Sequence, residues 1–331
     1  MLRGFLISII LLYFTSILEG QSYEDYLSSY LKEKSNIQLL QSVNQLNHDG
    51  KTKEAEQLLD QYQIYQKCDF LNLQYYISKL VINHELKKHD TALVYFIKAV
   101  QNGYSPEYSG LPKWAIYTRD TNIDSLEMLY IGRIDTGLAV KLSDMLAEDQ
   151  HSRFTKNNIR AIDSINKIRF DEIILTTGIP LKSAYGNKYY YGDQKYDFSL
   201  AILLIHFGEN YWNRYLDTLL HLAYYEEIEW SEIKFLMNAI FIRASNKTEF
   251  KPIKYLGDHS FKEYLMYESI LDVLGHNDVK IEVIFNGPED DPRLGKFKSM
   301  TNVLQHNAKI QIRVNDQEGS RGDHLFEFRR I

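Results

Sequence analysis

Three polar side chains in the middle of the chain have the types and the spacing that acid–base chemistry requires. Asp149, Gln150 and Arg153 stand within five residues of one another, in the sequence EDQHSR. Asp149 and Arg153 are four residues apart, so on a helix they share a face and pair. The carboxylate is then a candidate base or hydrogen-bond acceptor, and Arg153, with Gln150, a candidate for binding a substrate. The alternative is a polar network that joins helices and has only a structural role.

His206 is the second candidate for catalysis. It lies in AILLIHFG, an almost wholly apolar run that predicts a buried helix. A histidine there must be hydrogen-bonded, because a buried polar group without a partner costs about 1–3 kcal/mol. Asp149, Gln150 or Asp163 would orient it as half of a general-base arrangement. The alternative is a core histidine whose hydrogen bonds are satisfied, and no serine or cysteine stands out as a nucleophile.

A tyrosine-rich stretch, TTGIPLKSAYGNKYYYGDQKYD, follows these residues at 176–197. Gly178 predicts a left-handed helix cap and Pro180 prevents the helix from continuing, so the stretch is first a joint between two helices. Its glycines lack the spacing of a phosphate-binding loop, so no nucleotide is expected. Tyr189, Tyr190 and Tyr191 are candidates for a groove that stacks on sugars or peptide side chains, or they pack on neighbouring helices.

Helices are the elements that must position these side chains. Apolar residues recur at helical spacing along 125–154, 158–177, 198–207, 210–225 and 231–246. Two apolar stripes are expected to face the core of this region: Leu138, Leu142, Met145 and Leu146, and then Ile162, Ile165, Ile173 and Ile174.

Two helix hairpins are predicted ahead of this region, at 37–65 and 71–104. The second repeats the plan of the first after 37 residues, and Ala92, Phe96 and Ala99 give small, large and small side chains along its second helix. This pattern resembles tetratricopeptide repeats, whose period is about 34 residues. The resemblance implies a concave surface that binds a protein or peptide. Two prolines mark 105–120 as a linker.

The order of motifs in the middle region resembles a mostly bacterial family of domains of unknown function, over about 140–256. That family shows D-Q-x-x-R, D-x-x-N, G-x-P, a Gln-His pair and an Asp-Arg pair, often behind tetratricopeptide-like repeats. The matching residues are Asp149, Gln150, Arg153, Asp163, Asn166, Gly178, Pro180, His206 and Arg243. Ile205 and Ile242 replace the Gln and the Asp of the two pairs. The resemblance implies a helical domain and brings no known reaction.

The C-terminal part changes character. VKIEVIF, KIQIRV and HLFEF alternate as strands do, and PRLGKFKSMTNVLQHN predicts a helix between the first two. A β-α-β-β unit is therefore expected.

The N-terminus predicts a secretory signal peptide that is cleaved after Gly20. Arg3 precedes a short apolar run that ends in Glu19-Gly20, and about 14 apolar residues are fewer than a membrane span needs. The alternative is a retained anchor. The single cysteine, Cys68, cannot form an intramolecular disulfide, so an exported protein of this sequence would owe its stability to its core. Cys68 itself is expected to be buried.

The composition narrows the partners. A net charge of −6 disfavours a nucleic-acid partner, since phosphates require a basic face. The scattered histidines show no zinc spacing, so neither a metal nor a cofactor is expected.

The predicted protein is thus mainly α-helical and exported to the periplasm or cell surface. Its expected divisions are a signal peptide (1–20), helical repeats with a linker (21–120), a helical domain (121–258) and a small α/β domain (259–331). The first functional hypothesis is a binding or scaffolding protein of the bacterial envelope, with a protein, a peptide or cell-wall material as its partner. The alternative is an envelope hydrolase with Asp149 and His206 as acid and base, and with Arg153 or Arg243 holding an anionic group of the substrate.

Overall fold

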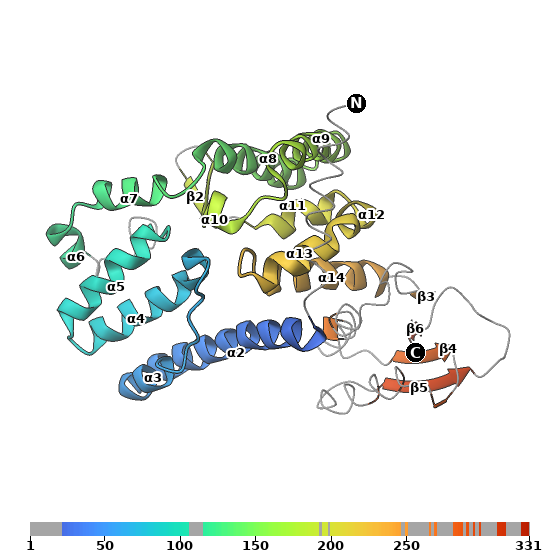
Figure 1. The fold of residues 1–331 in the computed structure, drawn as a ribbon, viewed down its shortest axis with the longest axis horizontal. Helices are drawn as coiled ribbons and strands as arrows, with labels where there is room; N and C mark the ends of the chain where they lie inside the picture. The colour runs from blue at the N-terminus through green and yellow to red at the C-terminus, as the bar shows by residue number, and fades with distance from the viewer. Residues whose placement is uncertain are drawn as a thin grey trace.

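The computed structural model shows a mainly helical protein (Figure 1). It describes residues 22–105, 115–191, 194–197, 199–245 and 249–250, together with a C-terminal set at 265, 268–269, 281–286, 289–290, 294, 298, 310–315 and 326–330. The predicted signal peptide lies outside the described residues. No helix within them is both long enough and apolar enough to cross a bilayer.

Helices α2 to α5 form the N-terminal part, which lies at the lower left of Figure 1. Their bounds are α2 Tyr23–His48, α3 Thr52–Leu59, α4 Leu73–Glu85 and α5 His89–Gln101, with a short 3-10 helix η1 Asp69–Asn72 before α4. Helix α2 begins well before the predicted residue 37. Ser22 starts it, because its hydroxyl accepts the Asp25 amide at 3.2 Å while the Asp25 carboxylate accepts the Ser22 amide at 2.9 Å.

The second hairpin packs as its pattern predicts. Ala92, Phe96 and Ala99 of α5 are all fully buried. Gly103, two residues beyond α5, has a φ of +101°. Whether the hairpins belong to the tetratricopeptide class stays a prediction. Cys68 is buried between them, and burial raises the pKa of its thiol to about 12, so it is a packing residue.

The predicted linker at 105–120 is helical in its second half. Helix α6 spans Ala115–Asp120 and is followed by α7 Ile123–Ile131. Tyr117 of α6 is buried in a cluster with Phe96 and Val100 of α5, which explains why this part of the chain is ordered as a helix against the hairpin.

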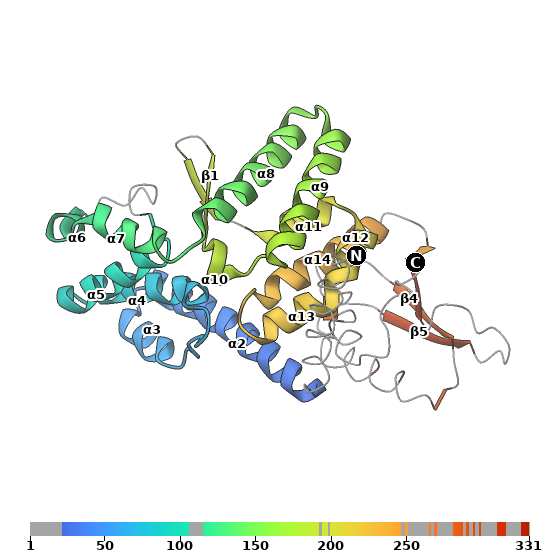
Figure 2. The ribbon, with the colours of Figure 1, turned by 45° about the horizontal axis from the view of Figure 1, so that its top comes forward.

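Helices α8 Thr136–Thr155 and α9 Ile159–Thr177 form an antiparallel pair that projects at the top of Figure 2. Asp135 begins α8 by accepting the Leu138 amide at 3.0 Å. The predicted stripe of α8 is buried, but that of α9 is partly wrong: Ile165 is 43% exposed. The buried face of α9 carries Asn166, Phe170 and Ile173, because the helix is rotated so that Asn166 faces α8.

The tyrosine-rich stretch has more structure than a joint. Gly178 ends α9 with φ +81° and ψ −171°, so its φ is positive as predicted while its ψ is extended rather than left-handed helical. A single turn, α10 Lys182–Tyr185, follows. Strands β1 Lys188–Tyr191 and β2 Gln194–Asp197 then pair antiparallel, with Tyr189 opposite Tyr196. The hairpin was not predicted, because three adjacent tyrosines do not alternate with polar residues.

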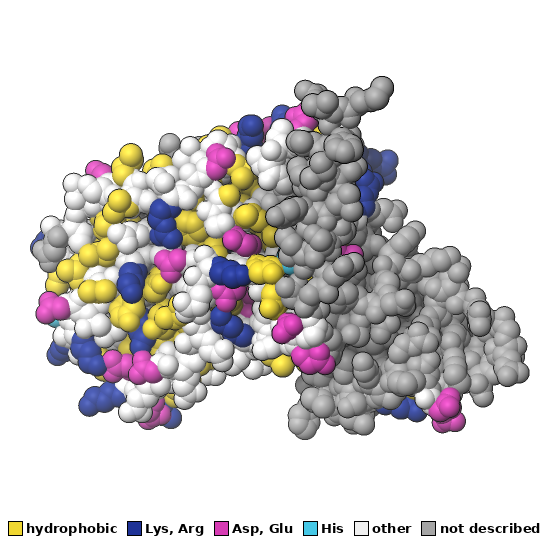
Figure 3. Space-filling view, in the orientation of Figure 1, with side chains coloured by type: hydrophobic (Ala, Val, Ile, Leu, Met, Phe, Trp, Pro, Cys, Tyr) yellow, Lys and Arg dark blue, Asp and Glu magenta, His cyan; other side chains and the backbone are white. Residues whose placement is uncertain are grey.

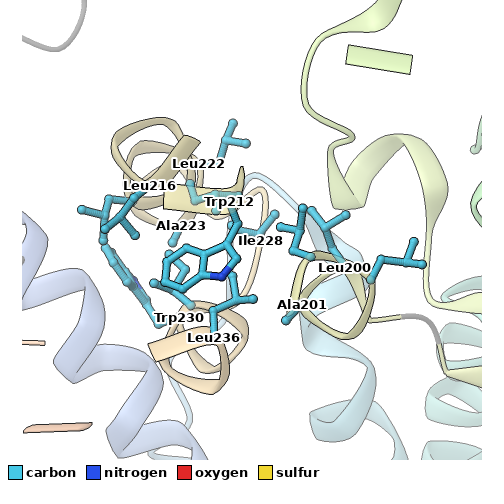
Figure 4. Packing of buried hydrophobic residues seen from close by; sticks show 14 of the residues in the cluster. Leu200, Ala201, Trp212, Leu216, Leu222, Ala223, Ile228, Trp230 and Leu236 are labelled. Atoms are coloured by element: carbon cyan, nitrogen blue, oxygen red, sulfur yellow. The ribbon is translucent and has the colours of Figure 1, made fainter. Parts of the chain in front are cut away.

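The remaining helices enclose the largest core. They are α11 Leu200–His206, α12 Glu209–Trp212, α13 Leu216–Tyr224 and α14 Trp230–Ser245, with η3 Asn213–Tyr215 between α12 and α13. Figure 4 shows their apolar side chains meeting around Trp212 and Trp230, both about 2% exposed. The predicted burial of α11 is confirmed, since Leu200, Leu203 and Leu204 are buried.

Carboxylates join α2 to the later helices. Glu33, 4% exposed, accepts the Trp230 amide at 2.9 Å and the Ser231 amide at 2.7 Å, and so caps the start of α14. Glu226 pairs with Lys32 at 2.7 Å and accepts the amides of residues 66 and 67. These contacts fix α2 against the middle of the chain.

The Glu33 carboxyl makes a pH dependence of stability predictable. Burial first, and the Glu229 charge second, raise its pKa to about 7, although two amides donate to it. The unfolded chain therefore loses this proton at lower pH than the folded chain, and stability falls as pH rises from about 5 to 8. Urea unfolding at pH 5 and at pH 8 measures this fall in the free energy of unfolding. We expect the fall to be about 2 kcal/mol smaller in Glu33→Gln than in wild type. Glu54→Gln, an exposed control, should retain it. A Glu33→Gln variant with the full wild-type fall would show that this carboxyl titrates normally.

Four strands lie in the C-terminal part: β3 Glu249–Phe250, β4 Ile281–Asn286, β5 Ile310–Asn315 and β6 Phe326–Arg330. They form one sheet in the order β3-β6-β4-β5, in which β4 and β5 are parallel and β6 is antiparallel to β4. The three predicted strands are thus present. The helix expected between the first two falls largely outside the described residues, so the β-α-β-β unit as a whole remains a prediction.

Candidate functional site

Asp149, Arg153, Asp163 and His206 meet in one cluster built by three helices. Asp149 and Arg153 share a face of α8 and pair at 2.9 Å, as their spacing predicts. Asp163 of α9 accepts from the same Arg153 nitrogen, Nη2, at 2.6 Å. His206, the last residue of α11, places Nδ1 2.9 Å from Asp149 Oδ2. The buried Asp149 carboxylate, which is 1% exposed, is therefore the centre of the cluster.

The hydrogen bonds of His206 define its tautomer. Its Nδ1 lies 2.9 Å from Asp149 Oδ2 and 3.1 Å from Arg153 Nε, which only donates. A single Nδ1 cannot donate to one and accept from the other. Arg153 Nε also reaches both Asp149 oxygens at 3.2 Å, so the consistent assignment is Nδ1–H donating to Asp149. In the neutral imidazole Nε2 is then the acceptor, and no described residue bonds to it.

The two carboxyls of the cluster are shifted in opposite directions. Burial raises the pKa of Asp149, but hydrogen bonds from His206 and Arg153 and the charges of these side chains outweigh it, so the pKa lies below the ordinary value. Burial also raises the pKa of Asp163. The ion pair with Arg153 lowers the pKa of Asp163, but burial, together with the Asp149 charge, outweighs it, so this pKa lies above the ordinary value. Both carboxylates hold the Arg153 guanidinium, and Asp149 is the one whose ionised form the cluster favours.

Of two further residues in the family-like motifs, Asn166 joins two helices and Gln150 contacts the central carboxylate from within the same helix. Asn166, fully buried on α9, donates to the Met145 carbonyl of α8 at 2.8 Å. Gln150 donates to Asp149 at 2.7 Å, which adds a donor to the central carboxylate. The start of α11 is fixed by Glu232 of α14, whose carboxylate accepts the Ala201 amide at 2.6 Å. The cluster thus combines the geometry of an acid–base pair with the contacts of a helix-joining network.

The other predicted site residues are not brought to the cluster by any described contact. Tyr189, Tyr190 and Tyr191 form β1, and Arg243 lies in α14, but their side chains are outside the described residues. Among the described part of the chain, no group of three or more His, Cys, Asp and Glu side chains could hold a metal ion.

A surface pocket of about 780 Å³ lies elsewhere, where α2 meets the chain around residues 63–67 and the end of α13. Tyr224 and Tyr225 line it, and their rings lie 5.1 Å apart at 82°. Lys67 stands over the Tyr225 ring at 3.8 Å. Sequence reasoning missed this pocket, because its walls come from segments about 160 residues apart; the adjacent tyrosines were the only signal.

Comparison with protein families, curated proteins and solved structures finds no match for this chain.

Proposed function

We propose that the protein is an exported binding protein of a bacterial envelope, and that it holds a peptide segment of a partner in the pocket beside α2. The pocket carries this proposal. It lies between the helical hairpins and the middle helices, and it has an aromatic wall of Tyr224 and Tyr225 with Leu27 and Leu31 of α2 nearby. Tyrosine side chains give large contact areas and lose little conformational entropy on binding, so such walls suit peptide binding.

The charges of the pocket indicate which peptide fits. Lys32 and Lys67 are already engaged, by Glu226 and by the Tyr225 ring. Glu24 and Asp25, at the first turn of α2, are exposed. A segment with an apolar side chain for the tyrosines and a basic residue for this acidic turn is the best complement. Figure 3 shows hydrophobic side chains interspersed with both kinds of charge over the described face, a mixture that is ordinary for protein interfaces.

Capture of partners from an envelope extract tests this function. Leu31, 44% exposed and in the pocket, is replaced by Glu, and Phe154, 89% exposed at the end of α8, is replaced by Ser as the matched control. We expect the partner to be retained by wild type and by Phe154→Ser, and lost by at least tenfold with Leu31→Glu, because the charge disrupts an apolar contact. A partner that binds all three proteins equally would place binding elsewhere.

Hydrolysis is the second candidate function, and the Asp149–His206 contact favours it. The carboxylate orients the imidazole so that Nε2 is the acceptor, which is the arrangement of a general base. No described serine, threonine or cysteine bonds to His206, so the nucleophile would be water. Hydrolysis of ester, amide or phosphoester substrates that disappears in His206→Gln, with the fold retained, would support this function. Equal turnover in both proteins would exclude His206 as the base.

A further inference from the structure

A cavity of about 470 Å³ lies where the N-terminal hairpins meet α10, α11 and α14. Its walls come from the segment around η1 and the start of α4 on one side, and from the three later helices on the other. The volume is within the range that suits a small molecule. None of its lining residues belongs to the pocket beside α2 or to the Asp149 cluster.

Lys182 is the unusual side chain of this cavity. It is 5% exposed, and its ammonium makes no ion pair or hydrogen bond with any described residue. It lies 5.6 Å from the centre of the Tyr185 ring, and the Glu232 charge acts on it from beyond ion-pair distance. A buried ammonium with no anion in direct contact is costly, and proteins ordinarily pair it. Lys182 therefore has the capacity to bind an anionic group that enters the cavity.

Two carboxylates line the same cavity. Glu232 accepts the Ala201 amide, whereas Glu229 has no ion pair among the described residues. Neither carboxylate lies within 4.0 Å of the Lys182 ammonium, since no ion pair joins them. The cavity thus presents a positive group and negative groups that are held apart. Phe70, Leu73, Ile202 and Phe235 supply an apolar part of the lining.

We propose that this cavity binds a small zwitterion of the α-amino acid type with an apolar side chain. Its carboxylate pairs with Lys182, its ammonium pairs with Glu229, and its side chain packs against Phe235 and Ile202. A zwitterion pairs with the buried Lys182 and the half-buried Glu229 at once, whereas a simple anion or a simple cation leaves one of the two unpaired. This site is independent of the peptide pocket, so each proposal can fail alone.

Calorimetric titration of the full chain with L-phenylalanine and L-leucine tests the site. We expect saturable binding that weakens by at least tenfold in Lys182→Met and in Glu229→Gln, because each removes one partner of a charge pair. Lys141→Met, a change at an exposed lysine of α8, is the matched control and should bind as wild type does. Lys182→Met should also raise the unfolding temperature of the free protein, because it removes a buried unpaired charge.

Blocked ligands identify which end each residue binds. Phenylalaninamide lacks the carboxylate, so its affinity should not change in Lys182→Met; N-acetylphenylalanine lacks the ammonium, so its affinity should not change in Glu229→Gln. If Lys182→Met does not fold, Glu229→Gln with the two blocked ligands carries the test. No saturable binding of either amino acid at millimolar concentration, or equal affinity in wild type and both variants, would overturn the proposal.

Discussion

Replacement of Asp149 by alanine is expected to destabilise the protein by about 3 kcal/mol at pH 7. The change removes the acceptor of Arg153, Gln150 and His206 at a position that is 1% exposed. Breaking a buried pair by removal of one partner costs about 3–5 kcal/mol, and the lower end applies because Arg153 and His206 retain some exposure. Urea unfolding at pH 7 measures the loss.

The pH dependence of this loss identifies its electrostatic origin. The folded Asp149 carboxyl has a depressed pKa, so its contribution is complete above the unfolded value of about 3.9 and declines as pH falls through the folded value. The difference in the free energy of unfolding between wild type and Asp149→Ala should therefore become smaller below about pH 4.

Asp163→Ala serves as the control, because the raised pKa of this carboxyl means that folding disfavours its ionised form. Its expected cost at pH 7 is about 1 kcal/mol or less. Equal losses for the two variants would contradict the assignment of Asp149 as the central acceptor.

Replacement of Gly186 by alanine should cost about 3 kcal/mol or more. Its φ of +75° and ψ of −157° belong to a region that only glycine occupies readily, with a strain of about 1–3 kcal/mol. A Cβ would also lie 2.4 Å from the Tyr130 hydroxyl and 3.0 Å from Ile134. Tyr130 cannot move freely, since it is 1% exposed and accepts the Asn187 amide at 3.1 Å.

Gly178→Ala is the matched comparison. Gly178 has a similar φ of +81°, but a Cβ there meets no atom within 4 Å, so only the backbone strain of about 1–2 kcal/mol remains. Chemical unfolding should show a larger loss of stability for Gly186→Ala than for Gly178→Ala. A larger loss for Gly178→Ala would show that the Tyr130 side chain moves aside at little cost and that the backbone strain differs between the two turns. Gly192, the other glycine of this stretch, lies outside the described residues.

Helices with one apolar face could be read from the sequence. The period of 3.6 residues locates α4, α5, α9 and α11 to within a few residues. The stretch predicted over 125–154 is instead divided into α7 and α8. The start of α2 was missed, although Ser22 and Asp25 have the spacing of a capping box. Ile165 shows the limit of periodicity: α9 turns a buried asparagine toward α8 and leaves that isoleucine in solvent.

The candidate site was partly predictable for the same reason. The spacing of Asp149 and Arg153 within one helix predicts their contact, and the apolar run around His206 predicts a polar partner for it. Glu33 and Lys182 gave no signal, because each stands on a helix turn of ordinary composition. Their burial results from the packing of segments far apart in the sequence, which no local pattern contains.

Polar contacts cross the boundary that was expected at residue 120. Glu33 caps α14, and Glu226 accepts two amides from the chain after α3. Asn187 donates to the carbonyls of Phe70 and Asn102 at 2.7 and 3.0 Å. A fragment that ended at residue 120 would leave the buried Glu33 carboxylate and the carbonyls of Phe70 and Asn102 without these partners. We therefore expect the hairpins and the middle helices to unfold as one cooperative unit, and an exchange of the hairpins during evolution would have to preserve all three contacts.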